Sequence, residues 1–145
     1  MKHAGILIMC SFFSLSQLMA SPVFHTEKPL RVAVIGLVHT HVHWILKKKK
    51  KGDIEIVGIA EPNRNLAAIY SKQHGYSMNL VYSSMEEMII KTKPEAVLAF
   101  NTIYDHLKVV EFCAPRGIHV MVEKPLAVSN EHATKMLALS KKYNI

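Results

Sequence analysis

The sequence predicts an α/β fold in which helices cover both faces of a doubly wound parallel sheet. Short apolar runs rich in Val and Ile alternate with segments of helical periodicity from residue 30 onward. These runs are nearly continuous, as is typical of strands that are buried on both faces. Right-handed crossovers between such strands give a doubly wound sheet, and ligands of these sheets bind at the carboxyl ends of the strands. The predicted strands cover 31–36, 54–60, 79–82, 95–100 and 118–122.

The segments between the middle strands carry recognisable helix ends. Asn63 can cap a helix that reaches His74, and Gly75 can then terminate it. Ser84 and Glu87 have the spacing of a capping box at the start of the next helix. These signals predict two helices with defined boundaries.

Two more predicted helices flank the final strand. Gly117 ends the first of them, which carries Leu107 and Val110 on an apolar face. Cys113 falls on the same face, which favours a buried small hydrophobe over a reactive thiol. Ser129 begins the last helix. The predicted inner face of that helix consists of Ala133, Met136, Leu137 and Ser140.

Positive charge is in excess, with a formal net charge of +7 at pH 7. Part of it is the lysine run 47–51, at the expected C-terminal end of the first helix, where cations complement the helix dipole. Neither aromatic residues nor a recognition motif accompany this run, so a solvated helix end is favoured over a nucleic-acid or anionic-membrane patch. No nucleic-acid partner is predicted.

The N-terminal residues have the pattern of an export signal. Lys2 supplies a positive start, 4–19 is apolar without acids or bases, and Ala20 offers a small residue for cleavage. A transmembrane anchor is disfavoured because serines weaken the stretch and it falls short of the ~20 strongly apolar residues that a span needs. We therefore expect an exported protein, periplasmic or secreted, without a stable membrane span.

The chain then divides into three parts: a signal peptide at 1–20, a flexible N-terminal segment at 21–29, and one domain at 30–145. This length fits the usual ~100–200 residues of one domain. Once the signal is removed, Cys113 is the only cysteine left, so no disulfide can form within the mature chain.

The turn after the first predicted strand covers 36–41 and reads Gly-Leu-Val-His-Thr-His. It keeps only the first glycine, Gly36, of the dinucleotide fingerprint GxGxxG, and Val38 and His41 occupy the other two places. Amides at the start of the following helix still point at an anion, and Thr40 can add a hydroxyl donor. The alternative is an ordinary turn of an α/β domain without a cofactor.

Three histidines alternate in this turn, His39, His41 and His43. If all lay on one helix, His39 and His43 would share a face and could hold a metal. No acidic or cysteine ligand lies in the same segment, so no metal is predicted. We instead expect one or two of these imidazoles to line a cofactor cleft.

Glu61 follows the second predicted strand. An acid at this position accepts hydrogen bonds from the adenosine ribose hydroxyls and repels the 2′-phosphate of NADP. Arg64 could instead attract that phosphate, so NAD is the favoured cofactor and NADP the open alternative. The structural alternative is a strand-end carboxylate that merely pairs with Arg64.

Two other strand ends carry polar residues. Asn101 and Thr102 follow the fourth predicted strand, and His106 lies in the first turn of the next helix, where each could face the nicotinamide side of a dinucleotide. Thr102 could also be a simple helix cap.

Glu123, Lys124 and Pro125 follow the last predicted strand. Pro125 disfavours helix at Lys124 and so presents that side chain from an extended segment. A lysine in a cleft can exchange a proton with a substrate hydroxyl. Glu123 could tether the ammonium group, and a solvated Glu-Lys pair in a loop is the alternative.

The chain resembles the Gfo/Idh/MocA family, the group of glucose–fructose oxidoreductase and inositol dehydrogenase. The segments that carry the resemblance are 32–36, 59–62, 93–97 and above all 117–127. The resemblance implies a Rossmann-type NAD(P)-binding domain over 30–145, with Lys124 as the catalytic residue near the nicotinamide. It also implies a sugar or polyol substrate.

Members of that family continue into one more strand and then a C-terminal α+β domain, which supplies a catalytic histidine and the oligomer interface. The sheet is therefore expected to be incomplete at its C-terminal edge. Two readings stay open: the cofactor half of a sugar or polyol oxidoreductase, or a non-catalytic dinucleotide-binding module, truncated or split, that needs a partner chain. A homo-oligomer or a complementing C-terminal domain would be that partner. The isolated chain is expected to show little or no turnover.

Overall fold

The computed structural model describes residues 28–47 and 52–145. The predicted signal peptide, nearly all of the predicted N-terminal segment and most of the lysine run lie outside these residues. Among the residues that are described, no helix combines the length and apolar character needed to cross a membrane.

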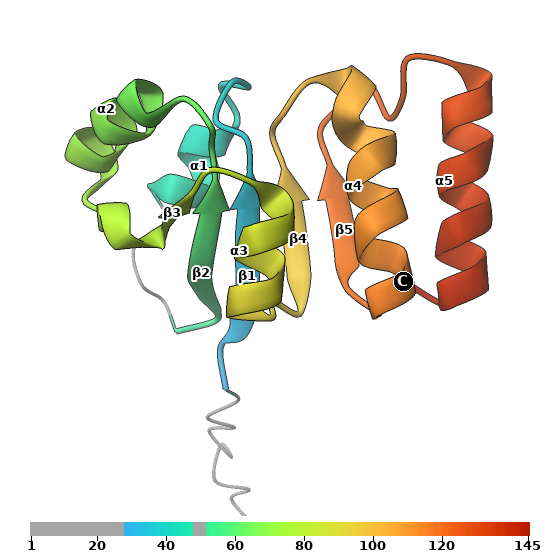
Figure 1. Ribbon diagram of the computed structural model, residues 1–145, viewed down its shortest axis with the longest axis horizontal. Coiled ribbons are helices and arrows are strands. Elements are labelled where there is room, and N and C mark those ends of the chain that lie inside the picture. Colours follow the sequence, from blue (N-terminus) through green and yellow to red (C-terminus); the bar gives the residue numbers. More distant parts are fainter. Residues whose placement is uncertain (1–27, 48–51) are drawn as a thin grey trace, which may run out of the picture.

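The described strands form one parallel sheet in the order β3-β2-β1-β4-β5, which confirms the predicted α/β architecture (Figure 1). The chain starts in the middle of the sheet, builds outward to β3, and then returns to build β4 and β5 on the other side. Such a reversal creates a crevice at the carboxyl ends of the strands beside the switch point. The strands are β1 (Leu30–Ile35), β2 (Ile54–Ala60), β3 (Val81–Tyr82), β4 (Ala96–Ala99) and β5 (His119–Val122).

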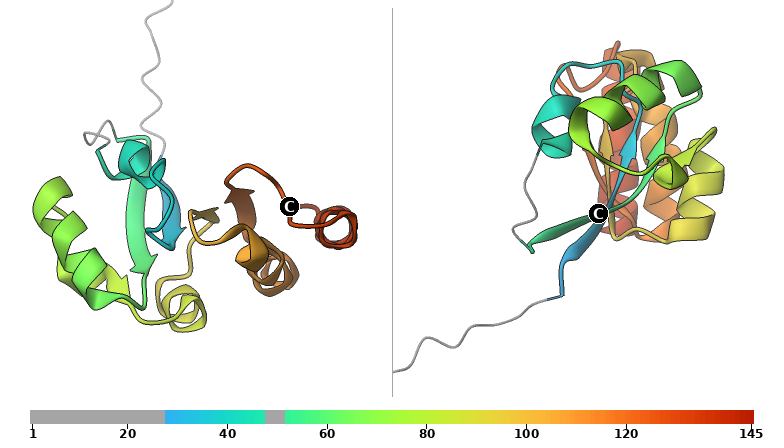
Figure 2. Two further views of the ribbon diagram at one scale, coloured as in Figure 1. Left: turned by 90° about the horizontal axis from the view of Figure 1, so that it is seen from above. Right: turned by 90° about the vertical axis from the view of Figure 1, so that its left-hand side faces the viewer.

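Helices cover both faces of the sheet, as the near-continuous apolar strands predicted (Figure 2). On one face, α3 (Met85–Thr92) and α4 (His106–Cys113) pack their buried side chains against the strands. On the other face, α1 (Val42–Leu46) and α2 (Arg64–His74) do the same. Fully burying one such aliphatic side chain contributes about 1.5–3 kcal/mol, so these two layers hold the domain together.

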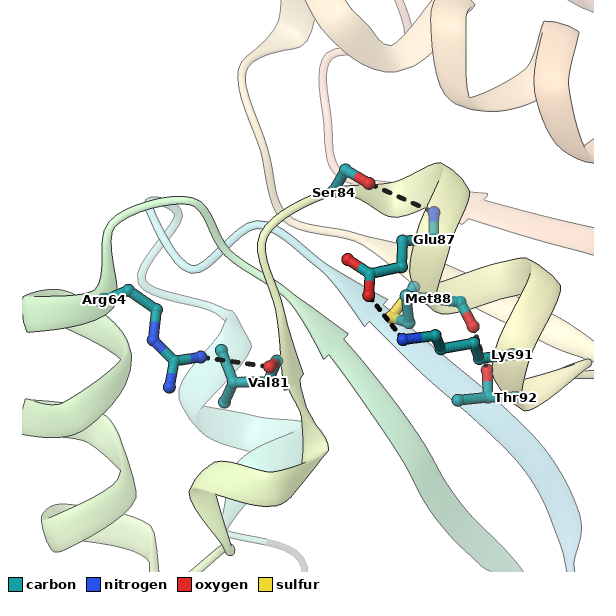
Figure 3. Close-up of polar contacts among 7 residues, drawn as sticks. All are labelled: Arg64, Val81, Ser84, Glu87, Met88, Lys91 and Thr92. Carbon is teal, nitrogen blue, oxygen red and sulfur yellow. Dashed lines mark hydrogen bonds and ion pairs between the residues drawn. The ribbon is translucent and has the colours of Figure 1, made fainter.

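The predicted helix ends are present. Asn63 Oδ1 accepts a hydrogen bond from the Leu66 amide at 3.1 Å, and Gly75 ends α2 in the left-handed conformation. Ser84 Oγ accepts from the Glu87 amide at 3.2 Å, so it caps α3 (Figure 3). The Glu87 carboxylate accepts from Lys91 Nζ at 2.7 Å (Figure 3).

The third predicted strand is shorter than expected. Of the run 79–82, only the last two residues pair with β2. The first two belong to a 3-10 turn, η1 (Met78–Leu80), because Ser77 Oγ accepts from the Asn79 amide at 3.2 Å and so starts a turn there. Two similar turns flank α4: η2 (Ile103–Asp105) and η3 (Ala114–Arg116).

The last helix, α5 (Asn130–Tyr143), lies beside α4 beyond the β5 edge (Figure 2). Met136 is its buried residue and packs with Leu107 and Val110 of α4. Leu137, which the sequence placed on the inner face, is exposed, because Met136 is the residue aimed at α4. Within the described residues β5 is one of the two edge strands of the sheet, and β3 is the other.

Candidate functional site

The carboxyl ends of β1, β2, β3 and β4 enclose an open cleft of about 350 Å³. This volume falls within the range of small-molecule sites, about 300–1,000 Å³. Five of the predicted cofactor-binding residues line it, together with the cap of α3. These lining residues are Gly36, Val38, Glu61, Ser84, Asn101 and Thr102.

Gly36 lines the cleft at the end of β1. Its φ of +76° is one that side chains disfavour, and a Cβ at this position would lie 2.7 Å from Cα and Cβ of Asn101. Its amide donates to the Ala60 carbonyl at 2.8 Å. The turn after β1 is therefore pressed against the ends of both neighbouring strands, which only glycine permits.

Glu61 is 3% exposed, and protein amides engage both of its carboxylate oxygens. Oε2 accepts from the Leu37 amide at 2.8 Å, and Oε1 accepts from the Asn63 amide at 2.8 Å. Glu61 thus ties the β1 turn to the start of α2. Each oxygen keeps a lone pair, so the group can still accept a hydrogen bond from a ligand in the cleft.

The Arg64 guanidinium donates from Nη1 to the Val81 carbonyl at 3.1 Å, so it bonds the backbone of β3 (Figure 3). Glu61 does not serve merely to pair with Arg64, because its carboxylate oxygens accept hydrogen bonds from backbone amides. Arg64 does not line the cleft.

The remaining residues of the β1 turn take different positions. Val38, at the second glycine position of the fingerprint, is 60% exposed and lines the cleft. Thr40 is exposed. The His39 amide donates to the Phe100 carbonyl at 3.1 Å, which ties the turn to the end of β4.

Asn101 and Thr102 bring the end of β4 to the cleft. Oδ1 of Asn101 is buried without a partner among the described residues, so this amide has bonding capacity that a polar ligand or a water molecule can take up. Thr102 Oγ1 donates to Asp105 Oδ2 at 2.5 Å, within η2. Thr102 also occupies the N-cap position of η2, although its side chain makes no capping bond.

Sequence reasoning missed a charged pair at the cleft. Lys108 Nζ lies 3.0 Å from Glu86 Oε1, and both residues line the cleft. A hydrogen bond from its own backbone amide, followed by Lys108, lowers the pKa of Glu86. The Ser84 cap was the available signal, because it places Glu86 in the first turn of α3.

A second group of predicted residues meets outside the cleft. Nδ1 of His41 lies 2.8 Å from Oε1 of Glu123, and the His41 ring stacks on Trp44 with centroids 4.1 Å apart. Burial raises the pKa of Glu123, but hydrogen bonds from His41 and the Lys124 amide and the charges of His41 and His39 outweigh it and lower the pKa overall. Glu123 therefore pairs with an imidazole and not with the Lys124 ammonium group.

His43 points elsewhere. Its Nδ1 lies 2.8 Å from Nε2 of His74 on α2. His39 and His43 do not share a helix face, because α1 begins only at Val42 and His39 lies in the preceding turn.

Lys124 and Pro125 follow β5, joined by a cis peptide bond, and both are exposed. The Lys124 amide donates to Oε2 of Glu123 at 3.1 Å. Neither residue lines the cleft, which lies on the other side of β4.

His106 is fully buried and does not line the cleft. Its Nδ1 lies 3.1 Å from the Leu126 carbonyl oxygen and donates to it, while its Nε2 is buried without a partner among the described residues. In this structure His106 supports the loop that carries Lys124.

Comparison with known proteins identifies the family of the chain. The model of the Gfo/Idh/MocA oxidoreductase family, described as an NAD-binding Rossmann fold, matches residues 30–145. D-glucoside 3-dehydrogenase of Escherichia coli K12 is 27% identical over 123 residues, which make up 81% of this chain and 33% of that protein.

Solved structures share the fold. Myo-inositol 2-dehydrogenase from Lactobacillus plantarum matches with a TM-score of 0.69 and 22% identity, over 80% of this chain and 34% of that one. The WlbA dehydrogenase from Bordetella pertussis, solved with NADH and UDP-GlcNAcA, matches with a TM-score of 0.69 and 19% identity, over 81% and 35%. The chain thus spans about a third of the length of each relative.

Proposed function

Because the chain belongs to the Gfo/Idh/MocA oxidoreductase family, with its NAD-binding Rossmann fold, we propose that it is the nucleotide-binding half of an oxidoreductase that acts on a sugar or polyol hydroxyl. The sequence predicted NAD as the cofactor, and the family is described as having an NAD-binding Rossmann fold. The observation that carries the proposal is the cleft at the carboxyl edge of the sheet, lined by Gly36 and Glu61.

The residues at the cleft suit the adenosine half of the cofactor. Glu61 is proposed to accept from a ribose hydroxyl with its remaining lone pairs, which favours NAD over NADP. Asn101 has an unpartnered acceptor beside the same space. When bound, NAD supplies the hydride acceptor for oxidation of a carbinol carbon.

Lys124 is the proposed catalytic residue. It lies exposed beyond β5, on the side of β4 away from the cleft, and its backbone is held by Glu123. From there we propose that its side chain holds the substrate hydroxyl and exchanges the proton.

The substrate-binding surface is proposed to come from additional polypeptide, in a homo-oligomer or a complementing C-terminal domain, since the relatives are about three times as long as the matched region. An apolar groove of about 240 Å³ supports this proposal. It lies between β5 and α5 and is lined by Val120, Val122, Met136 and Leu137. A non-catalytic module that needs a partner chain is the second candidate, and the same groove favours it.

Calorimetric titration of the full chain with NAD and NADP tests the cofactor site. We expect saturable NAD binding, weaker NADP binding, and a loss of about tenfold or more in NAD affinity for Val38→Asp, because the new charge repels the diphosphate. Val128→Asp is the matched control, since Val128 is similarly exposed, at 51%, but lies outside the cleft. Absence of heat with millimolar NAD, or equal affinity of the two variants, would refute the site.

Turnover separates the two candidates. The isolated chain is expected to reduce no NAD with any polyol, and robust turnover would show that no further polypeptide is needed. In an enzyme reconstituted with a complementing domain, Lys124→Ala is expected to retain NAD binding and lose activity. Unchanged activity would remove Lys124 from the chemistry, and no activity in any reconstituted pair would favour the non-catalytic module.

A further inference from the structure

We propose that His39, His41 and Glu123 bind a divalent transition-metal ion of the zinc class. One ligand atom from each residue lies within 4.8 Å of the other two. Two imidazoles and a carboxylate form a ligand set that zinc takes in sites with an open coordination position. None of the three residues lines the cleft proposed for the dinucleotide.

The ligand atoms are close to the spacing that a metal requires. Bonds of about 2.0–2.1 Å in a tetrahedral site place neighbouring ligand atoms roughly 3.3 Å apart. His41 Nδ1 and Glu123 Oε1 are already 2.8 Å apart and need only separate slightly as the ion replaces the proton between them. The other ligand atoms lie at most 4.8 Å apart, and we expect rotation of these half-buried side chains to bring them together.

Contacts around the site hold the ligands in place. The His41 amide donates to Nδ1 of His39 at 3.3 Å, and the His41 ring stacks on Trp44. Oε2 of Glu123 accepts from the Lys124 amide, which directs Oε1 toward the histidines. Ligands of metal sites are commonly oriented by such outer contacts.

The site is partly shielded and still reachable. The side chains of Glu123 and His41 are 12% and 27% exposed, so much of the cost of removing them from water is already met by folding. Three protein ligands leave at least one coordination position for water or a small oxygen ligand. Because Glu123 immediately precedes Lys124, such a ligand would lie near the backbone that carries the proposed catalytic amine.

His43 offers a matched control within the same histidine triplet. Its Nδ1 is bonded to His74 of α2, and it does not belong to the cluster. His43→Ala therefore removes one histidine of the triplet and leaves all three proposed ligands in place.

The test is a zinc titration of the full chain, produced without a histidine tag and stripped with chelator, by calorimetry and elemental analysis. We expect one Zn²⁺ per chain, and a loss of affinity of about tenfold or more in His41→Ala and in Glu123→Gln, because each removes a ligand. His43→Ala should bind as the unaltered chain does. Co²⁺ should give visible absorption bands that the same two variants lose.

Equal zinc affinity in His41→Ala and His43→Ala would overturn the proposal, as would loss of binding in both. Circular dichroism checks that each variant is folded, and His39→Ala replaces His41→Ala if the latter is not. The zinc titration tests only the metal site, and the NAD titration tests only the cofactor site. A negative result in one titration therefore does not decide the other proposal.

Discussion

The imidazole of His41 and the carboxylate of Glu123 lie 2.8 Å apart although 82 positions separate them in the chain. His41 follows β1 and Glu123 follows β5, and β4 lies between these strands in the sheet. The contact therefore spans the carboxyl edge of the sheet and joins the segment after the first strand to the segment that presents Lys124. Both the dinucleotide proposal and the metal proposal depend on this edge.

Glu61→Gln is expected to lower the free energy of unfolding by about 1–3 kcal/mol. The amide has one acceptor oxygen where the carboxylate has two, so either the Leu37 or the Asn63 amide loses its partner. Urea denaturation measures the difference. Glu55→Gln is the control, on the strand that Glu61 follows, because its exposed ion pair with Arg31, at 3.6 Å, contributes little. Equal stability of both variants would mean that the Glu61 bonds do not hold the turn.

Gly36→Ala is expected to destabilise the fold by more than Gly75→Ala. Both glycines have nearly the same φ, +76° and +77°, so an alanine at either position carries a backbone strain of about 1–2 kcal/mol. Only at Gly36 does the added Cβ meet Asn101 at 2.7 Å, whereas nothing lies within 4 Å at Gly75. The difference between the two thermal or chemical denaturation curves isolates the close approach. Identical losses would contradict the packing described for the β1 turn.

Acidification is expected to destabilise the contact between α1 and α2. Burial, then the charges of His43 and Lys47, lowers the pKa of His74 below its ordinary 6.5. The unfolded chain thus binds this proton more readily, so the stability is present above pH 6.5 and is lost as the pH falls through 6.5 toward the lower folded value. Denaturation at pH 8 and pH 5, compared between the unaltered chain and His74→Gln, should show a smaller acid loss in the variant. An equal loss would contradict the assignment to His74.

The Cys113 thiol is expected to be unreactive in the folded chain. Burial raises its pKa to about 12, against a smaller opposing effect of Arg116. In a Cys10→Ser background, Ellman's reagent at pH 8 should react about 100-fold more slowly with the native chain than with the denatured one. Fast reaction of the native chain would show that α4 opens readily.

The fold was largely predictable because its signals are local. Apolar runs marked the strands, and single residues such as Asn63, Ser84 and Gly75 marked the helix ends. Prediction was weaker where two signals competed: the run at 79–82 kept its apolar character, yet the Ser77 cap turned its first half into η1. On α5, periodicity could not decide whether Met136 or Leu137 faces α4.

The candidate site was predictable as a set of positions but not as a set of contacts. Strand ends place Gly36, Glu61 and Asn101 at one edge by topology alone. The partners of Glu61 are backbone amides, which no side-chain pattern reveals. The sequence did not suggest the proposed cluster of His39, His41 and Glu123 for a related reason, because its carboxylate lies at the far end of the domain from the two histidines.

The hydrogen bond from His106 to the Leu126 carbonyl has a consequence for how this domain can be joined to others. This bond ties the segment that carries Lys124 to α4, in the body of the domain, and not to α5 at its margin. We therefore expect a partner that displaces α5 to leave this bond intact, so that the position of Lys124 would not depend on α5.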